Sequence, residues 1–236
     1  MKIVSAFMWS YEREAATLHV ETLRDDVDAF VAVQANTTFQ GKKRDCEPLA
    51  IPGVVDVVIS LPPNRDAWEC EKWLRNKVLI EAHKIHGDDA IYIISDGDEI
   101  PHPEAIRRAV EAGKPMRLMT DYRNFYADWR AIDHVLEHQP TIGTYKQYEA
   151  VGGAGDARWH ANWDRSTISG WHLSSLGDTS EIKLKTFAHT EYNKPEYIQG
   201  IDNAKSNGRD FLNRFDLEHT NDVPPGVPKH LLGGKL

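Results

Sequence analysis

The hydrophobic pattern of the first half of the chain alternates short apolar runs with longer segments of helical spacing. The short runs predict strands at 2–9, 29–35, 54–60 and 90–94. The longer segments predict helices at 12–24, 66–86 and 103–112. Strands joined by helical or connecting segments over about 95 residues build parallel sheets. The pattern therefore predicts an α/β fold with a mostly parallel, Rossmann-like sheet.

The pattern changes after residue 114. We expect an extended aromatic segment at 116–128, a last strand at 183–192, a helix at 195–206 and a Pro- and Gly-rich tail at 223–234. The tail is expected either to lie along the surface or to close over a site. The sequence contains no internal repeat or evident linker, so we expect one domain, 1–236, with lobes at 1–113 and 114–236.

A stretch rich in glycine and tryptophan, 151–177, lies in the second lobe. Its aromatic rings can line a sugar-binding cleft, because ring faces pack against the apolar faces of pyranoses. Alternatively, the same rings form the core of an antiparallel lobe. The sequence leaves both interpretations open.

The strand predicted at 90–94 is followed by an acidic turn, residues 96–99. Asp96, Asp98 and Glu99 are three carboxylates in four positions, and Pro101 is expected to block continuation of the strand. In an open α/β sheet, ligands bind beyond the carboxyl ends of the strands. Crowded carboxylates of this kind suit Mg²⁺ or Mn²⁺ together with a phosphate-bearing substrate. The alternative is a solvated acidic turn without a ligand.

Composition and charge narrow the function classes. The chain has 236 residues, 41% of them hydrophobic and 27% charged, and a net charge of −8. The acidic balance argues against a protein that tracks a nucleic-acid backbone. Two distant cysteines, Cys46 and Cys70, indicate a reducing compartment. Since no segment reaches the roughly 18 apolar residues that span a bilayer, and no signal peptide is evident, we expect a soluble cytoplasmic protein.

Five segments carry a more specific signal: residues 27–41, residues 67–69 with Arg75 and Asn76, and residues 89–101, 169–174 and 185–191. In this order and spacing they resemble glycosyltransferase family 17. The resemblance covers most of the chain and implies a GT-A-type fold. Such a fold has a nucleotide-sugar-binding half with an Asp-X-Asp metal motif and an acceptor-binding half. The resemblance also implies a hexosyltransferase that inverts the configuration at the anomeric carbon.

The chain differs from the animal members of that family, which are longer and anchored in a membrane. We expect no anchor here and do not carry over their N-glycan acceptor. The chain looks more like compact bacterial or viral relatives. Their acceptors include a glycan, a lipid-linked sugar, a protein or a modified nucleobase. The sequence does not indicate an oligomeric state.

The resemblance implies a divalent metal, Mn²⁺ or Mg²⁺, that neutralises the departing diphosphate as a Lewis acid. Asp98 is the expected ligand, and Asp96 binds either the metal or the donor ribose. GT-A enzymes often take a further ligand from a late histidine. His172 and His189 both match family motifs and are the candidates here.

The resemblance also implies a donor site, expected to take a UDP-sugar. Arg75, with Asn76 beside it, is expected to bind the diphosphate, because a guanidinium forks onto phosphate oxygens. The residues that can share this role are Lys183, Lys185 and Arg209. The residues expected to hold the base and ribose are Phe7, Glu12, Gln34 and Asn36.

An inverting transfer requires a general base for the acceptor hydroxyl. Glu191 is the first candidate, with Glu99 and Asp210 as reserves. Three alternative functions stay open: glycosyl transfer to a modified nucleobase in DNA, metal-dependent phosphate hydrolysis, and carbohydrate binding without catalysis. Of these, only the transferases should bind a nucleotide sugar in a metal-dependent way.

Overall fold

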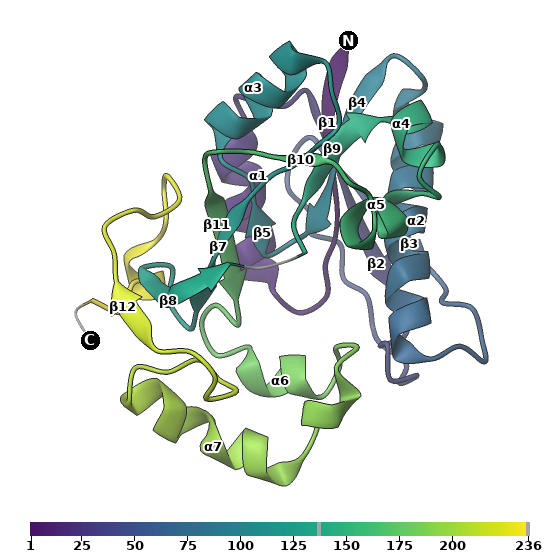
Figure 1. Cartoon of the computed structure of the whole chain (residues 1–236). Helices are drawn as coiled ribbons and strands as arrows, with labels where there is room; N and C mark the ends of the chain where they lie inside the picture. The colour runs from purple at the N-terminus through teal and green to yellow at the C-terminus, as the bar shows by residue number, and fades with distance from the viewer. Residues whose placement is uncertain (136–137, 235–236) are drawn as a thin grey trace.

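Residues 1–135 and 138–234, which the computed structural model describes, form two mixed β-sheets surrounded by helices (Figure 1). The chain is therefore an α/β protein, as its hydrophobic pattern predicts. No helix in this part of the chain is both long enough and apolar enough to cross a bilayer.

The first sheet has a parallel core at the four places where strands are predicted. These strands are β1 (Lys2–Met8), β2 (Ala29–Ala35), β3 (Val54–Ile59) and β4 (Ala90–Asp96), in the order β4-β1-β2-β3. Shorter strands extend the sheet beyond β4, namely β9 (Thr141–Thr144), β6 (Met116–Arg117) and β10 (Asp164–Arg165). Because β9 is antiparallel to β4 and β6, the sheet is mixed. It draws strands from both predicted lobes.

Helices cover both faces of the first sheet (Figure 1). They are α1 (Arg13–Leu23), α2 (Ala67–His86), α3 (Pro103–Ala112), α4 (Tyr145–Glu149) and α5 (Ala154–Trp159). α1 and α3 share one buried apolar cluster with the sheet, and α2, α4 and α5 share another. α2 begins at residue 67 because Asp66 and Glu69 form a capping box there.

The second sheet begins directly after the acidic turn. Its strands are β5 (Glu99–Ile100), β7 (Thr120–Asn124), β8 (Trp129–Val135), β11 (Gly170–Ser174) and β12 (Leu217–His219), in the order β12-β8-β7-β11-β5. β5 leaves the direction of β4 before Pro101 and pairs with β11. The acidic turn is thus the junction of the two sheets, with Asp96 in one and Glu99 in the other.

Two helices lie between β11 and β12 in the chain, α6 (Ser180–Leu184) and α7 (Pro195–Ser206), and 3-10 turns occur at η1 (Thr190–Tyr192) and η2 (Lys229–Leu231). α7 confirms the predicted helix at 195–206. The predicted strand at 183–192 is wrong, because this segment is helical at both ends. The buried residues Leu184 and Ala188 are four positions apart, with half-buried Phe187 between them, and this spacing suits a helix rather than a strand.

The described part of the tail lies against the second sheet. The backbone N–H groups of Gly233 and Gly234 donate to the carboxylate of Asp128, at 2.8 and 3.0 Å, and Leu231 is buried in the core. Of the two positions expected for the tail, the structure therefore supports the one on the surface.

Candidate functional site

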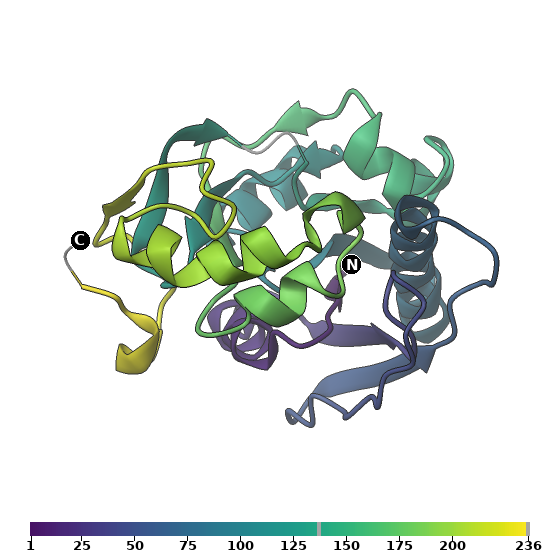
Figure 2. The same cartoon turned by 90° about the horizontal axis from the view of Figure 1, so that it is seen from below.

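A cavity of about 300 Å³ opens at the carboxyl ends of β1, β2 and β4. Figure 1 shows α6 and α7 below this end of the sheet, and Figure 2, the view from below, shows them crossing in front of it. α6 contributes Lys183 to the wall, while the acidic turn contributes Asp96 and Asp98. The cavity thus lies at the sheet edge where the sequence predicts a ligand.

The five motif segments identified in the sequence all reach this cavity. One lining residue from each is Thr38, Trp68, Asp98, His172 and Phe187. These residues come from the loop after β2, from α2, from the acidic turn, from β11 and from the segment after α6. Tertiary structure therefore brings together segments that lie up to about 150 residues apart, since protein sites are assembled from distant loops and strand ends.

The backbone holds the acidic turn tightly. Gly97 donates its N–H to the carbonyl of Met8 at 2.8 Å, and Leu173 donates to the carbonyl of Asp98 at 2.7 Å. A Cβ at Gly97 would lie 2.9 Å from the Cβ of Trp9. Only glycine therefore lets the turn approach β1 this closely.

Two carboxylates of the turn are bound by arginines. Arg75 approaches Asp96 at 2.8 Å, and Arg158 donates to both oxygens of Glu99 at 2.9 and 2.6 Å and to Asp96 at 3.4 Å. The Glu99 side chain has no exposed surface, and that of Arg75 has 1%. Burial alone would raise the pKa of Asp96, but Arg75 and Arg158 outweigh it and hold that pKa below its usual value.

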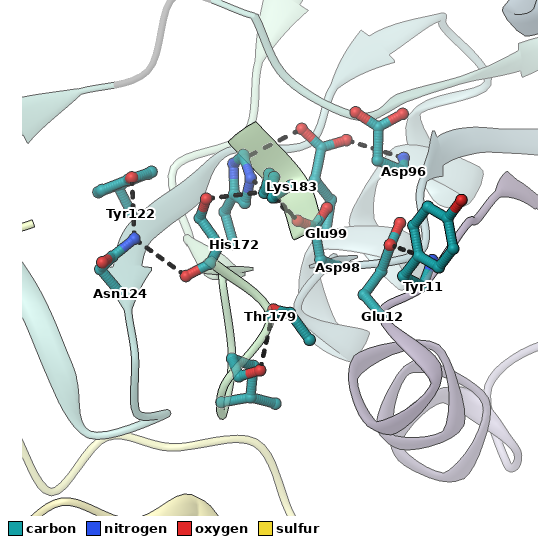
Figure 3. Close-up of polar contacts among 12 residues, drawn as sticks. Tyr11, Glu12, Asp96, Asp98, Glu99, Tyr122, Asn124, His172, Thr179 and Lys183 are labelled. Atoms are coloured by element: carbon teal, nitrogen blue, oxygen red, sulfur yellow. Dashed lines mark hydrogen bonds and ion pairs between the residues drawn. The ribbon is translucent and has the colours of Figure 1, made fainter. Parts of the chain in front are cut away.

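The third carboxylate, Asp98, is paired with Lys183 (Figure 3). Lys183 Nζ lies 2.7 Å from Asp98 Oδ2 and donates to Ser174 Oγ at 3.0 Å. His172 lies between the acids, with Nε2 3.7 Å from Asp98 and Nδ1 3.7 Å from Glu99. Burial opposes ionisation of Asp98, but Lys183 and His172 hold its pKa far below the usual range.

Two further acids in the cavity are harder to ionise. Burial raises the pKa of Glu12, Asp98 raises it further, and Lys183 offsets only part of this. Glu12 accepts a hydrogen bond from the backbone N–H of Tyr11 at 2.8 Å (Figure 3). Burial also raises the pKa of Glu71, although Arg75 partly opposes the shift. A carboxylate with a raised pKa is a better proton acceptor once it is ionised.

Aromatic rings form another part of the cavity lining. The ring centroid of Trp68 lies 4.3 Å from that of His189 and 5.8 Å from that of Trp159. Trp68 remains 38% exposed, so part of its ring is open to a ligand. The lining therefore combines charged side chains with partly open aromatic rings, the mixture found in small-molecule sites.

Several predicted site residues do line the cavity, namely Glu12, Asp96, Asp98, His172 and His189. Arg75 instead lies behind Asp96, and Asn76 accepts a hydrogen bond from the N–H of Gly155 at 2.7 Å. These two residues support the wall rather than form it.

Three residues predicted to hold the base and ribose do not line the described cavity. Phe7 is fully buried in the core against His19, with ring centroids 4.6 Å apart. Gln34 donates to the carbonyl of Glu47 at 2.7 Å, and Asn36 donates to Ser60 at 2.9 Å. All three lie near strand ends as expected, but their side chains turn to other partners.

The predicted bases lie outside the lining of the cavity in the described part of the chain. Glu99 is locked by Arg158, and Asp210 is fully buried, accepting from the N–H groups of Arg214 and Phe215 at 2.5 and 2.9 Å. Glu191 is 53% exposed and pairs with His189 at 2.8 Å.

Two predicted cations also pair outside the cavity lining: Lys185 with Glu181, and Arg209 with Asp216 at 2.7 Å. Lys183, the other lysine considered for this role, is the one that reaches the acids. Position explains the difference, because Lys183 lies within α6 whereas Lys185 is the residue that ends it, and residues two positions apart on a helix point in different directions.

Sequence reasoning missed the roles of Glu71 and Arg158, which line the site beside the acidic turn. The i, i+4 spacing of Glu71 and Arg75 is typical of a surface ion pair, but in the structure Arg75 is buried, Glu71 is 16% exposed, and Arg75 also contacts Asp96. Arg158 gives no signal in the sequence, since it belongs to the short helix α5 and meets Glu99 only through the fold. Neither role is readable from local spacing.

Among the described residues, no group of three or more His, Cys, Asp or Glu side chains has an arrangement suited to a metal ion. No model of a known protein family matches the chain, and no curated protein is significantly similar to it.

Proposed function

We propose that the chain is a glycosyltransferase of the GT-A type, related to family 17, that moves a sugar from a nucleotide sugar to an acceptor hydroxyl. One observation carries this proposal: all five segments that resemble the family contribute to the wall of one cavity. The five segments lie far apart in the sequence, and a shared functional site explains why all of them line the same cavity.

The composition of the cavity supports the same function. A donor diphosphate requires cations, an acceptor hydroxyl requires a base, and a sugar or a nucleobase ring packs against aromatic faces. Lys183, Glu12 and Trp68 supply one group of each kind within the lining. A carbohydrate-binding protein would use the aromatic rings but has no use for the buried charges.

The divalent metal that the resemblance implies fits these side chains poorly. Both oxygens of Asp96 lie against arginines, at 2.8 Å from Arg75 and 3.4 Å from Arg158. Asp98 is the remaining ligand, but its Oδ2 is 2.7 Å from the ammonium of Lys183. A divalent ion at Asp98 would sit beside this like charge. The proposed transfer therefore includes no step at a metal.

We assign the general base to Glu12 in place of Glu191, Glu99 and Asp210. Glu12 lines the cavity, and its raised pKa makes it a stronger base than an exposed carboxylate. In the transfer, the acceptor oxygen forms a bond to the anomeric carbon and gives its proton to Glu12. The bond to the donor phosphate breaks on the opposite face, and the diphosphate leaves with the electron pair.

The test is binding and turnover of nucleotide sugars. The chain is expected to bind sugars carried on one nucleoside diphosphate and to hydrolyse that donor slowly in the absence of acceptor. A ligand at 100 times its dissociation constant stabilises the folded state by about 2.7 kcal/mol. For a domain of this size, that raises the melting temperature by about 5–10 °C.

Other outcomes point to the other functions. Hydrolysis of phosphate esters without binding of nucleotide sugars would support the phosphohydrolase. A thermal shift with free glycans alone would support the carbohydrate-binding protein. If a donor binds, the same assay with glycans and with DNA containing modified bases as acceptors distinguishes the two classes of transferase.

A further inference from the structure

We propose that Lys183 is the cation that binds the donor diphosphate, so that donor binding needs no divalent metal. This inference rests on the proposed transferase function. It concerns how the charge of the leaving group is balanced, which the resemblance to family 17 assigns to a metal.

Among the cations that line the described cavity, Lys183 differs from the arginines in how its N–H donors are used. Arg44 donates to the carbonyls of Ala35 and Ser10, at 3.0 and 2.9 Å. Arg158 is held by Glu99 at 2.6 Å. Their donors are thus largely used in fixing the protein.

Arg214, the other cation of the lining, is bound to Asp210 at 2.9 Å and lies over the ring of Phe215. Lys183 has two acceptors, Asp98 at 2.7 Å and Ser174 at 3.0 Å. An ammonium has three N–H donors. One donor of Lys183 therefore has no acceptor among the described residues, and 27% of the side chain is exposed in the cavity.

Lys183 also occupies the position that a metal would take. It contacts Oδ2 of Asp98, the oxygen that lies 3.7 Å from His172. Ser174, from the end of β11, fixes the ammonium from a second side. A metal at Asp98 has to displace this ammonium, because like charges at contact distance repel. Lys183 and a metal are therefore alternatives rather than partners.

The pairing also keeps Lys183 charged. Burial lowers the pKa of Lys183, but Asp98 more than compensates and holds that pKa above its usual value. The pair formed by the Lys183 ammonium and the Asp98 carboxylate carries no net charge as a whole. The remaining donor of Lys183 still attracts phosphate oxygens, as in other lysine–phosphate contacts.

The test measures binding of the nucleoside diphosphates UDP, GDP, ADP and dTDP by calorimetry, with a chelator and then with Mn²⁺. We expect one of these nucleoside diphosphates to bind in the presence of the chelator, with an affinity that Mn²⁺ does not increase. Lys183→Met should weaken this binding about tenfold or more, since an ionic hydrogen bond is lost. Binding of the corresponding nucleoside should not change, because it has no phosphate.

Three variants separate the role of the charge from a structural role. Lys185→Met is the matched control, since Lys185 pairs with Glu181 outside the cavity lining, and it should bind as the wild type does. Lys183→Arg keeps the cation and should retain part of the affinity. Lys183→Met combined with Asp98→Asn removes both charges. Diphosphate binding by this double variant should stay weak if the loss of the cation, rather than an unpaired Asp98, causes the weaker binding of Lys183→Met.

The possible failures are distinguishable. Binding of a diphosphate only in the presence of Mn²⁺ would overturn the inference and leave the transferase intact. The same conclusion follows if Lys183→Met binds the diphosphate as tightly as the wild type does. If no nucleoside diphosphate and no nucleotide sugar binds under either condition, the proposed function itself fails.

Discussion

The three carboxylates of the acidic turn face three different cations. Asp96 meets Arg75, Glu99 meets Arg158 and Asp98 meets Lys183. The two arginine pairs support the turn, because a bidentate guanidinium fixes both the position and the direction of the carboxylate that it binds. Of the three cations, Lys183 has the largest exposed fraction, 27% of its side chain, and one of its donors has no acceptor among the described residues. At the scale of residues, the turn thus divides into a structural part and a part that can meet a ligand.

Glu12→Gln is expected to lower turnover by about 100-fold or more, because a general base contributes that much, while donor affinity stays close to that of the wild type. In the wild type, turnover should fall as the pH drops through the raised pKa of Glu12, since the base must be ionised. The pH profile of kcat and a binding titration check both points.

The same substitution should raise thermal stability at neutral pH. The folded state holds the proton of Glu12 more tightly than the unfolded state, so stability is lost as the pH rises from the usual value of 4.5 through the raised pKa. Glutamine removes this loss. Glu191→Gln, at an exposed acid, is the control and should change neither property. Full turnover in Glu12→Gln would rule out the assigned base.

At the scale of elements, the approach of β11 to β5 places His172 opposite Glu99. The register pairs Trp171 with Ile100 and His172 with Glu99. This approach depends on Gly170, where a Cβ would lie 2.1 Å from the carbonyl oxygen of Ile100 and 2.6 Å from the N–H nitrogen of His102. Both contacts are with backbone, which cannot move aside as a side chain does.

Gly170→Ala is therefore expected to destabilise the protein by about 1–3 kcal/mol or more, as overpacking in a core does. Gly200→Ala is the matched control, because Gly200 lies inside α7 with no atom within 4 Å of the added Cβ. There, alanine should stabilise by up to about 1 kcal/mol. Urea unfolding measures both. Equal stabilities would mean that β11 and β5 can separate without cost.

At the scale of the whole molecule, segments from opposite sides of the cavity touch each other. Gln40 donates to the carbonyls of Leu184 and Phe187 at 3.4 and 3.3 Å, and Asn193 donates to Gln40 at 2.7 Å. The two contacts that Gln40 donates are long, and the three contacts together join the loop after β2 to the end of α6 and the segment that follows it. A ligand between the two segments should strengthen the closure.

Binding of a nucleoside diphosphate is thus expected to slow amide hydrogen exchange in three separate segments, 36–44, 96–99 and 180–190. Each contributes to the cavity wall, and a ligand held by all three opposes local opening of each. α3, which contributes no residue to the described lining, should be unaffected and is the control. Protection confined to a single segment would place the ligand elsewhere.

The parallel strands and their helices were predictable because their signals are local. An apolar run or a helical spacing reflects only near neighbours, so β2 and α3 are found at their predicted residues. The segment 183–192 was predicted wrongly because the helical spacing of its buried residues extends over only about one turn. β9 was not predicted, as it has only four residues and contains a glycine.

The site was predictable in part. The acidic turn and Glu12 reach the cavity because a strand end in a parallel sheet always faces the same edge. Phe7 also lies near a strand end, but successive side chains of a strand point to opposite faces, and Phe7 points into the core. The position of a residue was therefore readable, whereas the direction of its side chain was not.

The sequence by itself determined where the strands of the parallel core lie and that one of them ends in crowded carboxylates. Only the tertiary structure decided which cations meet those carboxylates. Arg158 is 59 residues from Glu99, and Lys183 is 85 residues from Asp98. The chain has 28 lysine and arginine residues, and spacing does not distinguish them. Packing selects the partners, because a charge that is buried must find an opposite charge within reach of the folded backbone.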